Sequence, residues 1–452
     1  MTSGKNLASA TAKPRPGSSV TAGTGPAART VAAKLAPMPA EQRRRVLGLR
    51  CRECGAEYEL QATHVCEACF GPLDVHYDYD VIRRVVSRER IAQGPPTMWR
   101  YRDLLPLDDE AAIVSLGEGF TPLVKAERLG AQLGLRNLFL KNDSMNPTNS
   151  FKDRVVSVAV SWAGAHGFET IGCASTGNLA NSVAAYAARA GLQCYVFVPD
   201  DTEEEKLVAT SVFEPHLVAV RGTYDEVNRL CSQVMDELPW AFCNINVRPF
   251  YAEGSKTLTF ETAEQLGWRL PDEIIIPIAS GCQFVRHRHA ISELLELGLV
   301  DGPGIPRLTG AQALGCAPVY NAWREGTERV TPVRPRTIAR SIAIGNPSDG
   351  SYVVRIARET GGVVEAVTEE EIVDAIGLLA RTEGIFTETA GGVTIGVLAK
   401  LARAGRWEGD EVVVAYVTGH GLKTADAVSD GSSARRMEIE PSLRSFRERL
   451  FL

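Results

Sequence analysis

From about residue 100 onward, the chain alternates short apolar runs with alanine-rich stretches of helical periodicity. This alternation is what most constrains its fold. We expect helices that include 179–191 and 254–267, and strands at 137–141, 170–175, 194–199, 216–220, 273–278 and 411–418. Strands that are apolar throughout and separated by helices form parallel sheets covered on both faces. The sequence therefore predicts an α/β fold.

Ligands of open α/β folds bind at the carboxyl ends of the strands, so the loops that follow the strands are the candidate site. Four loops stand out: "NPTNSFKDR" (146–154), "ASTGN" (174–178), "ASGCQ" (279–283) and "YVTGHGLKT" (416–424). The second offers hydroxyls and backbone N–H groups at a helix N-terminus, which suit a carboxylate or phosphate. The small residues of the third let the backbone approach an anion closely. Taken singly, each loop also fits an ordinary capped turn.

Lys152 lies in the first turn of a helix expected after "NPTNS". The positive end of a helix and partial burial both favour the neutral form of an amine. A neutral amine is what a Schiff-base lysine requires. The alternative for this stretch alone is a solvated lysine at a helix start.

The overall composition is that of a globular protein. The 452 residues are 44% hydrophobic and 23% charged, which predicts two or three domains. The net charge of −6 gives no general attraction to nucleic acid or anionic membranes, and no apolar run reaches the roughly 20 residues of a membrane span. Residues 1–45 hold no acid before Glu41 and are rich in small residues and proline. We expect a disordered tail there, although a transit peptide has a similar composition.

A cysteine-bearing module is expected at 46–80. Two Cys-x2-Cys pairs lie eleven residues apart, formed by Cys51, Cys54, Cys66 and Cys69. This spacing is typical of a structural four-cysteine zinc site, and the alternative is a module that folds without metal. The other six cysteines are scattered and form no disulfide framework, so we expect a reducing, cytoplasmic location.

Seven ordered blocks resemble the threonine synthase family: "SMNPTNSFKDR", "ASTGNLANSVAAYAARAGL", "YAEGSKTLTFETAEQLGW", "GAQALGCAPV", "SIAIGNPSDG", "TETAGGVTIGVLAKL" and "YVTGHGLK". The resemblance runs from about residue 50 to about 430. It implies two open, mostly parallel α/β domains of the tryptophan synthase β-like, pyridoxal-phosphate-binding fold at 81–452. The smaller domain is expected at roughly 150–260, and a zinc-ribbon-like module precedes both.

The resemblance also implies roles for individual residues. Lys152 matches the lysine that holds pyridoxal phosphate and then acts as general base, and Asn178 matches the partner of the cofactor's 3′-oxygen. Thr418 matches the residue at the pyridine nitrogen, and Arg154 is expected near the substrate phosphate. The substrate carboxylate would lie at Ser175, Thr176 and Gly177, and the cofactor phosphate at Ala279, Ser280, Gly281, Cys282 and Gln283. The basic run "RHRHA" (286–290) beyond that loop is expected to be a solvated helix face.

The implied reaction converts O-phospho-L-homoserine and water to L-threonine and phosphate in a homodimeric enzyme. The nearest alternative is a β-replacement on O-phosphoserine, as in cysteate synthase, because both reactions use the same lysine and cofactor loops. A remote alternative is a zinc-ribbon nucleic-acid binder with a degenerate enzyme domain. Its local positive charge would come from Arg43, Arg44, Arg45, Arg50 and Arg52.

Overall fold

The computed structural model describes residues 44–450 apart from 176, 201, 203, 223, 303 and 430–436. The tail predicted at 1–45 therefore falls almost wholly outside the described residues. Its last residue, Arg45, is already part of the fold, because its guanidinium pairs with Asp103 at 3.0 Å. Within the described ranges, no helix combines the length and apolar character needed to cross a membrane.

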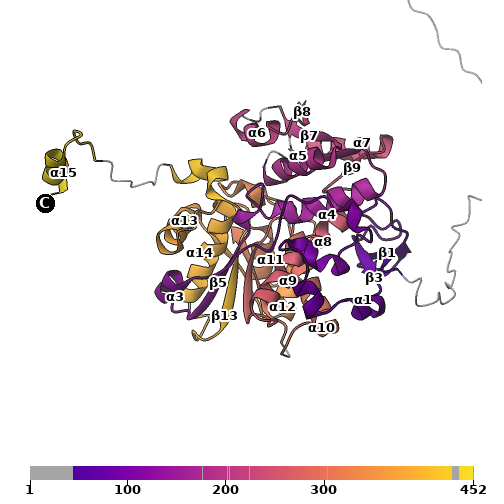
Figure 1. Cartoon of the computed structure of the whole chain (residues 1–452), viewed down its shortest axis with the longest axis horizontal. Coiled ribbons are helices and arrows are strands. Elements are labelled where there is room, and N and C mark those ends of the chain that lie inside the picture. Colours follow the sequence, from indigo (N-terminus) through magenta and orange to yellow (C-terminus); the bar gives the residue numbers. More distant parts are fainter. Residues whose placement is uncertain are drawn as a thin grey trace, which may run out of the picture. The chain divides into compact units, whose positions relative to one another are not determined.

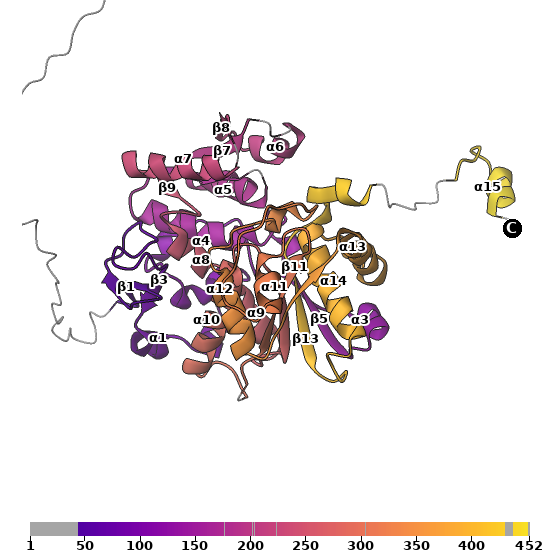
Figure 2. The same ribbon diagram turned by 180° about the vertical axis from the view of Figure 1, so that it is seen from behind.

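The cysteine module is built on a small antiparallel sheet with strand order β2-β1-β3. Its strands are β1 (Val46–Cys51), β2 (Glu57–Tyr58) and β3 (Leu73–Tyr77). The module lies beside helix α8 (Arg248–Glu253), as Figures 1 and 2 both show. The contact is partly polar, because the Tyr77 hydroxyl donates to Glu253 Oε2 at 2.7 Å in the buried interface. The module is therefore packed onto the rest of the chain.

The larger sheet has six strands in the order β12-β11-β10-β13-β5-β4. All neighbours are parallel except the pair formed by β4 and β5. Strand β10 shows why these strands are apolar throughout: Ile274 and Ile276 pack into one hydrophobic cluster, and Ile275 packs into another. The six strands are β4 (Leu123–Lys125), β5 (Asn137–Asn142), β10 (Glu273–Pro277), β11 (Arg307–Ala313), β12 (Val364–Val367) and β13 (Val412–Val417).

The smaller sheet has four parallel strands in the order β8-β7-β6-β9, and it spans residues 170–242. Its strands are β6 (Thr170–Ala174), β7 (Gln193–Pro199), β8 (His216–Val220) and β9 (Ala241–Phe242). The helices around it are α4 (Lys152–Ala165), α5 (Asn178–Ala190), α6 (Glu204–Ser211) and α7 (Tyr224–Glu237). Helix α5 ends at Gly191, whose φ of 70° is the left-handed conformation that glycine adopts without strain.

The remaining helices complete the fold. Helix α13 begins with a capping box, in which Thr368 and Glu371 each bond the other's backbone N–H. The α-helices are α1 (Tyr79–Val85), α2 (Arg88–Ala92), α3 (Glu127–Leu133), α9 (Lys256–Gln265), α10 (Cys282–Glu296), α11 (Pro318–Arg324), α12 (Gly350–Glu359), α13 (Glu369–Glu383), α14 (Thr389–Arg403) and α15 (Leu443–Leu450). The 3-10 helices are η2 (Met98–Leu104), η3 (Glu110–Ala112), η4 (Asp143–Met145), η5 (Arg340–Ile342) and η6 (Gly421–Val428).

The predicted α/β fold with mostly parallel sheets is confirmed. All six predicted strands are present, each with ends within one residue of the expected ones. Four further strands of the two large sheets were not predicted: β4, β9, β11 and β12.

Candidate active site

A pocket of about 640 Å³, open to solvent, lies where the predicted loops meet. Seven chain segments converge on it: the starts of α4, α5 and α14, the loop between β10 and α10, the end of β13, the junction of α8 and α9, and η5. Its lining residues include Phe151, Lys152, Asn178, Tyr251, Ser255, Ala279, Ser280, Gly281, Cys282, Gln283, Ser341, Glu388 and Thr418. The pocket thus lies at the carboxyl ends of strands from both sheets.

Lys152 is the first residue of α4 and is half-buried at the pocket. Its Nζ lies 5.4 Å from the centroid of the Phe151 ring. Burial lowers the pKa of Lys152, while Cys282 and Glu388 act in the opposite direction. A larger fraction of this amine is therefore neutral than on a solvated lysine at the same pH. Among the described residues that line the pocket, Lys152 is the single basic side chain.

The loop between β10 and α10 presents a helix N-terminus to the pocket. Gly281 caps α10 in the left-handed conformation, with a φ of 90°. The first N–H groups of a helix have no partner within it and attract anions. Gln283 adds a side-chain donor, because its Nε2 is buried and has no hydrogen-bond partner in the part of the chain that the structure describes. This donor set fits a phosphate group.

Asn178 and Glu388 face each other across the pocket. Asn178 Nδ2 donates to both carboxylate oxygens of Glu388, at 3.0 Å each. Glu388 is only 2% exposed, and burial raises its pKa. Its backbone N–H donates to Gly419 O at 3.0 Å, which fixes it beside the end of β13. Glu388 was not predicted as a site residue. Its position just before the small-residue helix in "TETAGG" was the sequence feature that could have indicated it.

Thr418 follows β13 directly, lines the pocket and is 7% exposed. Its carbonyl accepts from Phe151 N at 2.8 Å, which ties the lysine loop to this strand. Ser175 and Gly177 are not among the lining residues, and Gly177 is exposed. Thr176 lies outside the described residues. The structure thus brings Lys152, Asn178, the 279–283 loop and Thr418 together, and leaves Ser175 and Gly177 outside the pocket lining.

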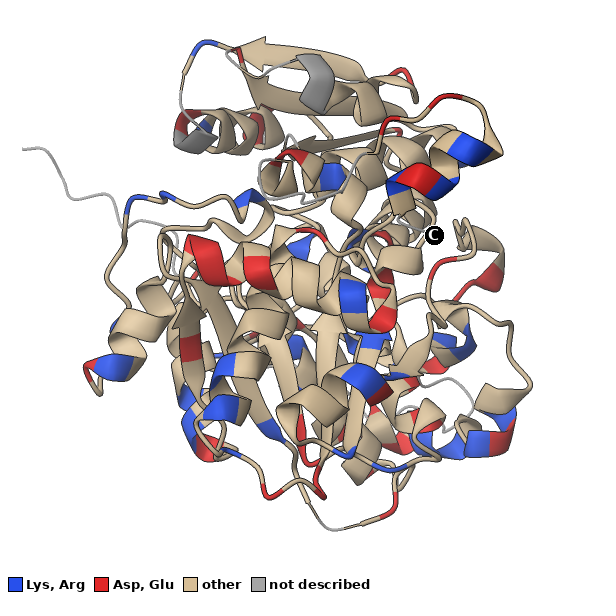
Figure 3. Ribbon diagram, turned by 90° about the vertical axis from the view of Figure 1, so that its left-hand side faces the viewer, with Lys and Arg blue, Asp and Glu red and all other residues tan. Residues whose placement is uncertain are grey.

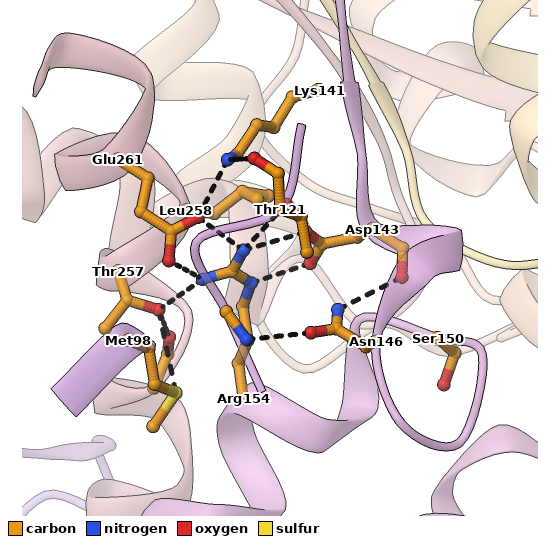
Figure 4. A network of polar contacts seen from close by, with 12 residues as sticks. Met98, Thr121, Lys141, Asp143, Asn146, Ser150, Arg154, Thr257, Leu258 and Glu261 are labelled. Carbon is orange, nitrogen blue, oxygen red and sulfur yellow. Dashed lines mark hydrogen bonds and ion pairs between the residues drawn. The ribbon is translucent and has the colours of Figure 1, made fainter. Parts of the chain in front are cut away.

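Arg154 was expected near the substrate phosphate, but it is not among the residues that line the pocket. Its side chain is fully buried, and its guanidinium is bonded to Asp143 and Glu261 at 2.6–2.8 Å (Figure 4). Lys141 Nζ joins the same network at 2.7 Å from Glu261 Oε2. Residues two apart on a helix point to different faces, so Arg154 points into the protein interior when Lys152 faces the pocket. Arg154 therefore stabilises the protein interior next to the site through its ion pairs with Asp143 and Glu261.

The four cysteines of the front module form one cluster. Their Sγ atoms all lie within 4.8 Å of one another, and two pairs are 3.5 and 3.6 Å apart. A disulfide would bring sulfurs to about 2.05 Å. The sulfurs of a tetrahedral zinc–thiolate site, with bonds of about 2.3 Å, are about 3.8 Å apart. The cluster therefore has a spacing that fits one metal ion.

In the view of Figure 3, segments with acidic and with basic residues are interspersed along the ribbon. The net charge of −6 agrees with this view. Nucleic-acid binders carry concentrated positive charge. The charge distribution thus favours a small-molecule site over the nucleic-acid alternative.

The chain is similar to known proteins both in sequence and in fold. Residues 114–419 match the family described as "Pyridoxal-phosphate dependent enzyme", and residues 50–73 match "NinF protein". Threonine synthase of Methanocaldococcus jannaschii is 40% identical over 381 residues, which cover 84% of this chain and 93% of the relative. Threonine synthase of Methanosarcina acetivorans is 37% identical over 410 residues, covering 89% and 98%.

Solved structures support the same fold. Threonine deaminase isoform 2 from Solanum lycopersicum superposes with a TM-score of 0.58 at 21% identity, covering 69% of this chain and 88% of that one. Diaminopropionate ammonia lyase from Escherichia coli gives a TM-score of 0.59 at 17% identity, covering 71% and 90%. At these identities the likeness concerns the fold alone. The family match and the identity and coverage of the sequence relatives show that the chain belongs to the threonine synthases, within the pyridoxal-phosphate-dependent enzymes.

Proposed function

We propose that the pocket around Lys152 converts O-phospho-L-homoserine and water to L-threonine and phosphate. The observation that carries this proposal is a half-buried lysine with a lowered pKa, opposite a helix N-terminus with a free amide donor, in a chain of this family. Bound pyridoxal phosphate supplies an electron sink for the carbon next to the substrate amine. The chain's own residues supply binding, orientation and proton handling.

Four sets of residues would hold the cofactor. Lys152 would hold it covalently, and the N–H groups at 279–283 with Gln283 Nε2 would bind its phosphate. Asn178 lines the same pocket and would bond the ring's 3′-oxygen, and Thr418 would face the pyridine nitrogen. Ser175, Thr176 and Gly177 remain our proposal for the substrate carboxylate, because they connect β6 directly to Asn178.

Lys152 and Glu388 are the proton-handling groups that we propose. Lys152 Nζ would take the proton from the substrate carbon next to the amine, since burial keeps a larger fraction of it neutral. Glu388 would take part as a second acid–base group, because burial raises its pKa towards neutrality. Both line one pocket, so both can contact the same bound substrate.

The direct test is a steady-state assay of the purified protein with pyridoxal phosphate and O-phospho-L-homoserine, measuring phosphate and threonine. Lys152→Ala should lower the rate by at least about 10³-fold, because it removes both the covalent attachment and the base. Lys125→Ala, an exposed lysine on β4, is the matched control and should keep full activity. Absence of threonine with wild-type protein would overturn the proposal. Cysteate formed from O-phosphoserine and sulfite would favour the alternative.

We further propose that Cys51, Cys54, Cys66 and Cys69 hold a structural zinc ion. Four thiolates complete a tetrahedron and leave no open position for chemistry. The spacing of their sulfurs supports this role. We also propose a homodimer in the cytoplasm, where free thiols persist; all ten cysteines are free.

A further inference from the structure

Arg52 lies inside the first cysteine pair and reaches out of the module. Its Nε and Nη2 donate to the two carboxylate oxygens of Asp74 on β3, at 2.9 and 2.8 Å. Its Nη1 donates to Asp349 Oδ1 at 2.8 Å, nearly three hundred residues further along the chain. The guanidinium also lies over the Tyr352 ring, 4.6 Å from its centroid. One arginine of the metal knuckle thus contacts the start of α12.

Asp349 is in direct contact with the loop proposed for the cofactor phosphate. Its carboxylate is 1% exposed and also accepts from Arg248. Its backbone N–H donates to Ser280 O at 2.9 Å. A Cβ at Gly281 would lie 3.0 Å from Asp349 Cβ, so the loop and Asp349 are packed without spare room. The position of Asp349 therefore determines the position of the loop.

The module is connected to the same helix by a second route. Asp74 also accepts from Arg286, which lies one turn into α10 and is almost fully buried. Arg286 Nη1 in turn lies 2.9 Å from Glu253 Oε1 on α8. Arg52 and Asp74 of the module thus hold both the N-terminal loop of α10 and its second turn. The "RHRHA" run therefore faces the protein interior, whereas a solvated helix face was expected from the sequence.

We propose that Arg52 is a positioning residue that couples the metal site to cofactor affinity, through Asp349 and the 280–283 loop. This inference rests on the proposed function. A metal held by Cys51 and Cys54 fixes the backbone that carries Arg52 between them. Arg52 then fixes Asp349, and Asp349 holds Ser280 and Gly281 in the geometry that receives the phosphate. Because coupling between two binding sites is reciprocal, cofactor binding also stabilises the metal site.

The test measures the dissociation constant of pyridoxal phosphate by absorbance titration of the full-length protein. Arg52→Ala should raise it on the order of tenfold, as supporting residues around a ligand site do. Arg52→Lys keeps a charge and one donor, and should restore part of the affinity. Arg50→Ala is the matched control, because Arg50 is an exposed arginine two residues away, on β1. Zinc content and thermal unfolding of each variant establish that the module is intact.

A double-mutant cycle separates positioning from general loss of packing. If Arg52 acts through Asp349, then Arg52→Ala with Asp349→Asn should raise the dissociation constant no more than the stronger single change does. Additive effects, or an unchanged constant in Arg52→Ala with full zinc, would overturn the coupling.

Zinc removal provides a second measurement that needs no variant. Stripping the wild-type protein with a chelator should weaken binding of pyridoxal phosphate by a similar factor, and saturating cofactor should slow zinc release. Equal cofactor affinity with and without zinc would overturn the coupling while leaving the proposed function intact. A wild-type protein that binds no pyridoxal phosphate would overturn the proposed function, and this inference with it.

Discussion

Lys152 and Glu388 line one pocket, and burial acts on both, lowering the pKa of the amine and raising that of the carboxyl group. Each shift favours the neutral form. The charged carboxylate in turn favours the protonated amine. The protonation states of the two groups are therefore linked, and a change at one residue should be measurable at the other.

The variant Glu388→Gln tests this link. The amide keeps an acceptor for Asn178 Nδ2 and removes the negative charge that raises the pKa of Lys152. The pH midpoint for covalent capture of pyridoxal phosphate by Lys152 should therefore move downward. Borohydride trapping followed by mass spectrometry at a series of pH values measures this midpoint. A midpoint that stays in place would show that the two groups titrate independently.

Glu388→Ala distinguishes charge from hydrogen bonding. It removes both acceptors of Asn178 and leaves the amide unpaired, so cofactor affinity should fall by roughly tenfold.

At the residue level, motifs in the sequence predicted Lys152, Asn178, the 279–283 loop and Thr418, and all of them line the pocket. The same motif did not reveal that Arg154 is buried, because sequence proximity to Lys152 does not determine on which face of the helix a side chain lies. The buried acids that surround it, Asp143 and Glu261, lie in other segments and gave no local signal.

At the level of secondary structure, apolar runs predicted six strands, and β10 among them is buried by hydrophobic contacts on both faces. Strand β11 escaped because its sequence "RLTGAQA" reads as polar. Thr309 and Gln312 are nevertheless buried, since the Gln312 amide oxygen accepts from Val319 N and Tyr320 N at 3.0 Å and Thr309 bonds to Glu273. These partners lie outside the strand, at Glu273, Val319 and Tyr320, so the pattern of residues within β11 cannot reveal them.

Gly281→Ala is the sharpest test of a single element. Gly281 has a φ of 90°, and an added Cβ would lie 2.9 Å from Val353 Cγ2 and 3.0 Å from Asp349 Cβ. We expect a loss of about 1–3 kcal/mol in unfolding free energy and weaker cofactor binding. The matched control is Gly298→Ala at the other end of α10, where φ is also positive, at 66°, and the added Cβ meets nothing. If both variants lose cofactor affinity equally, the packing on Asp349 is not the cause.

At the level of the whole molecule, His287 connects stability to pH. It is fully buried, its Nδ1 lies 2.7 Å from Thr259 Oγ1, and its ring meets that of Tyr416 edge-on. Burial, with a smaller effect of Arg154, lowers the pKa of His287 to about 3. The unfolded chain binds this proton near pH 6.5, so stability is fully present above that pH and is lost as the pH falls towards 3.

We expect His287 to contribute a loss of about 2 kcal/mol in unfolding free energy between pH 7 and pH 5. Urea unfolding at the two pH values measures it, and His287→Gln should remove that part of the slope. His216→Gln, which replaces an exposed histidine on β8, should leave the slope as it is. A slope of the same size in His287→Gln would show that other groups carry the acid sensitivity.

The cysteine spacing predicted a front module, and the alternation of strands and helices predicted a larger α/β part; the structure has a small antiparallel sheet and two larger, mostly parallel ones. The contacts between them could not be predicted from sequence, because Arg52 and Asp349 lie 297 residues apart and no local pattern pairs them. Only the folded structure shows that a cysteine knuckle and a cofactor loop share an aspartate.

The strand-like bridge that joins Ser150 to Gly419 has a consequence for the synthesis of the enzyme. It connects the lysine loop, near the start of the catalytic region, to a residue just after β13, which is synthesised much later. Contacts so distant in sequence form late in folding, because closing a long loop costs entropy before the contact repays it. A chain still emerging from the ribosome therefore has its lysine but no finished pocket. Binding of the cofactor therefore indicates that synthesis of the chain has passed β13.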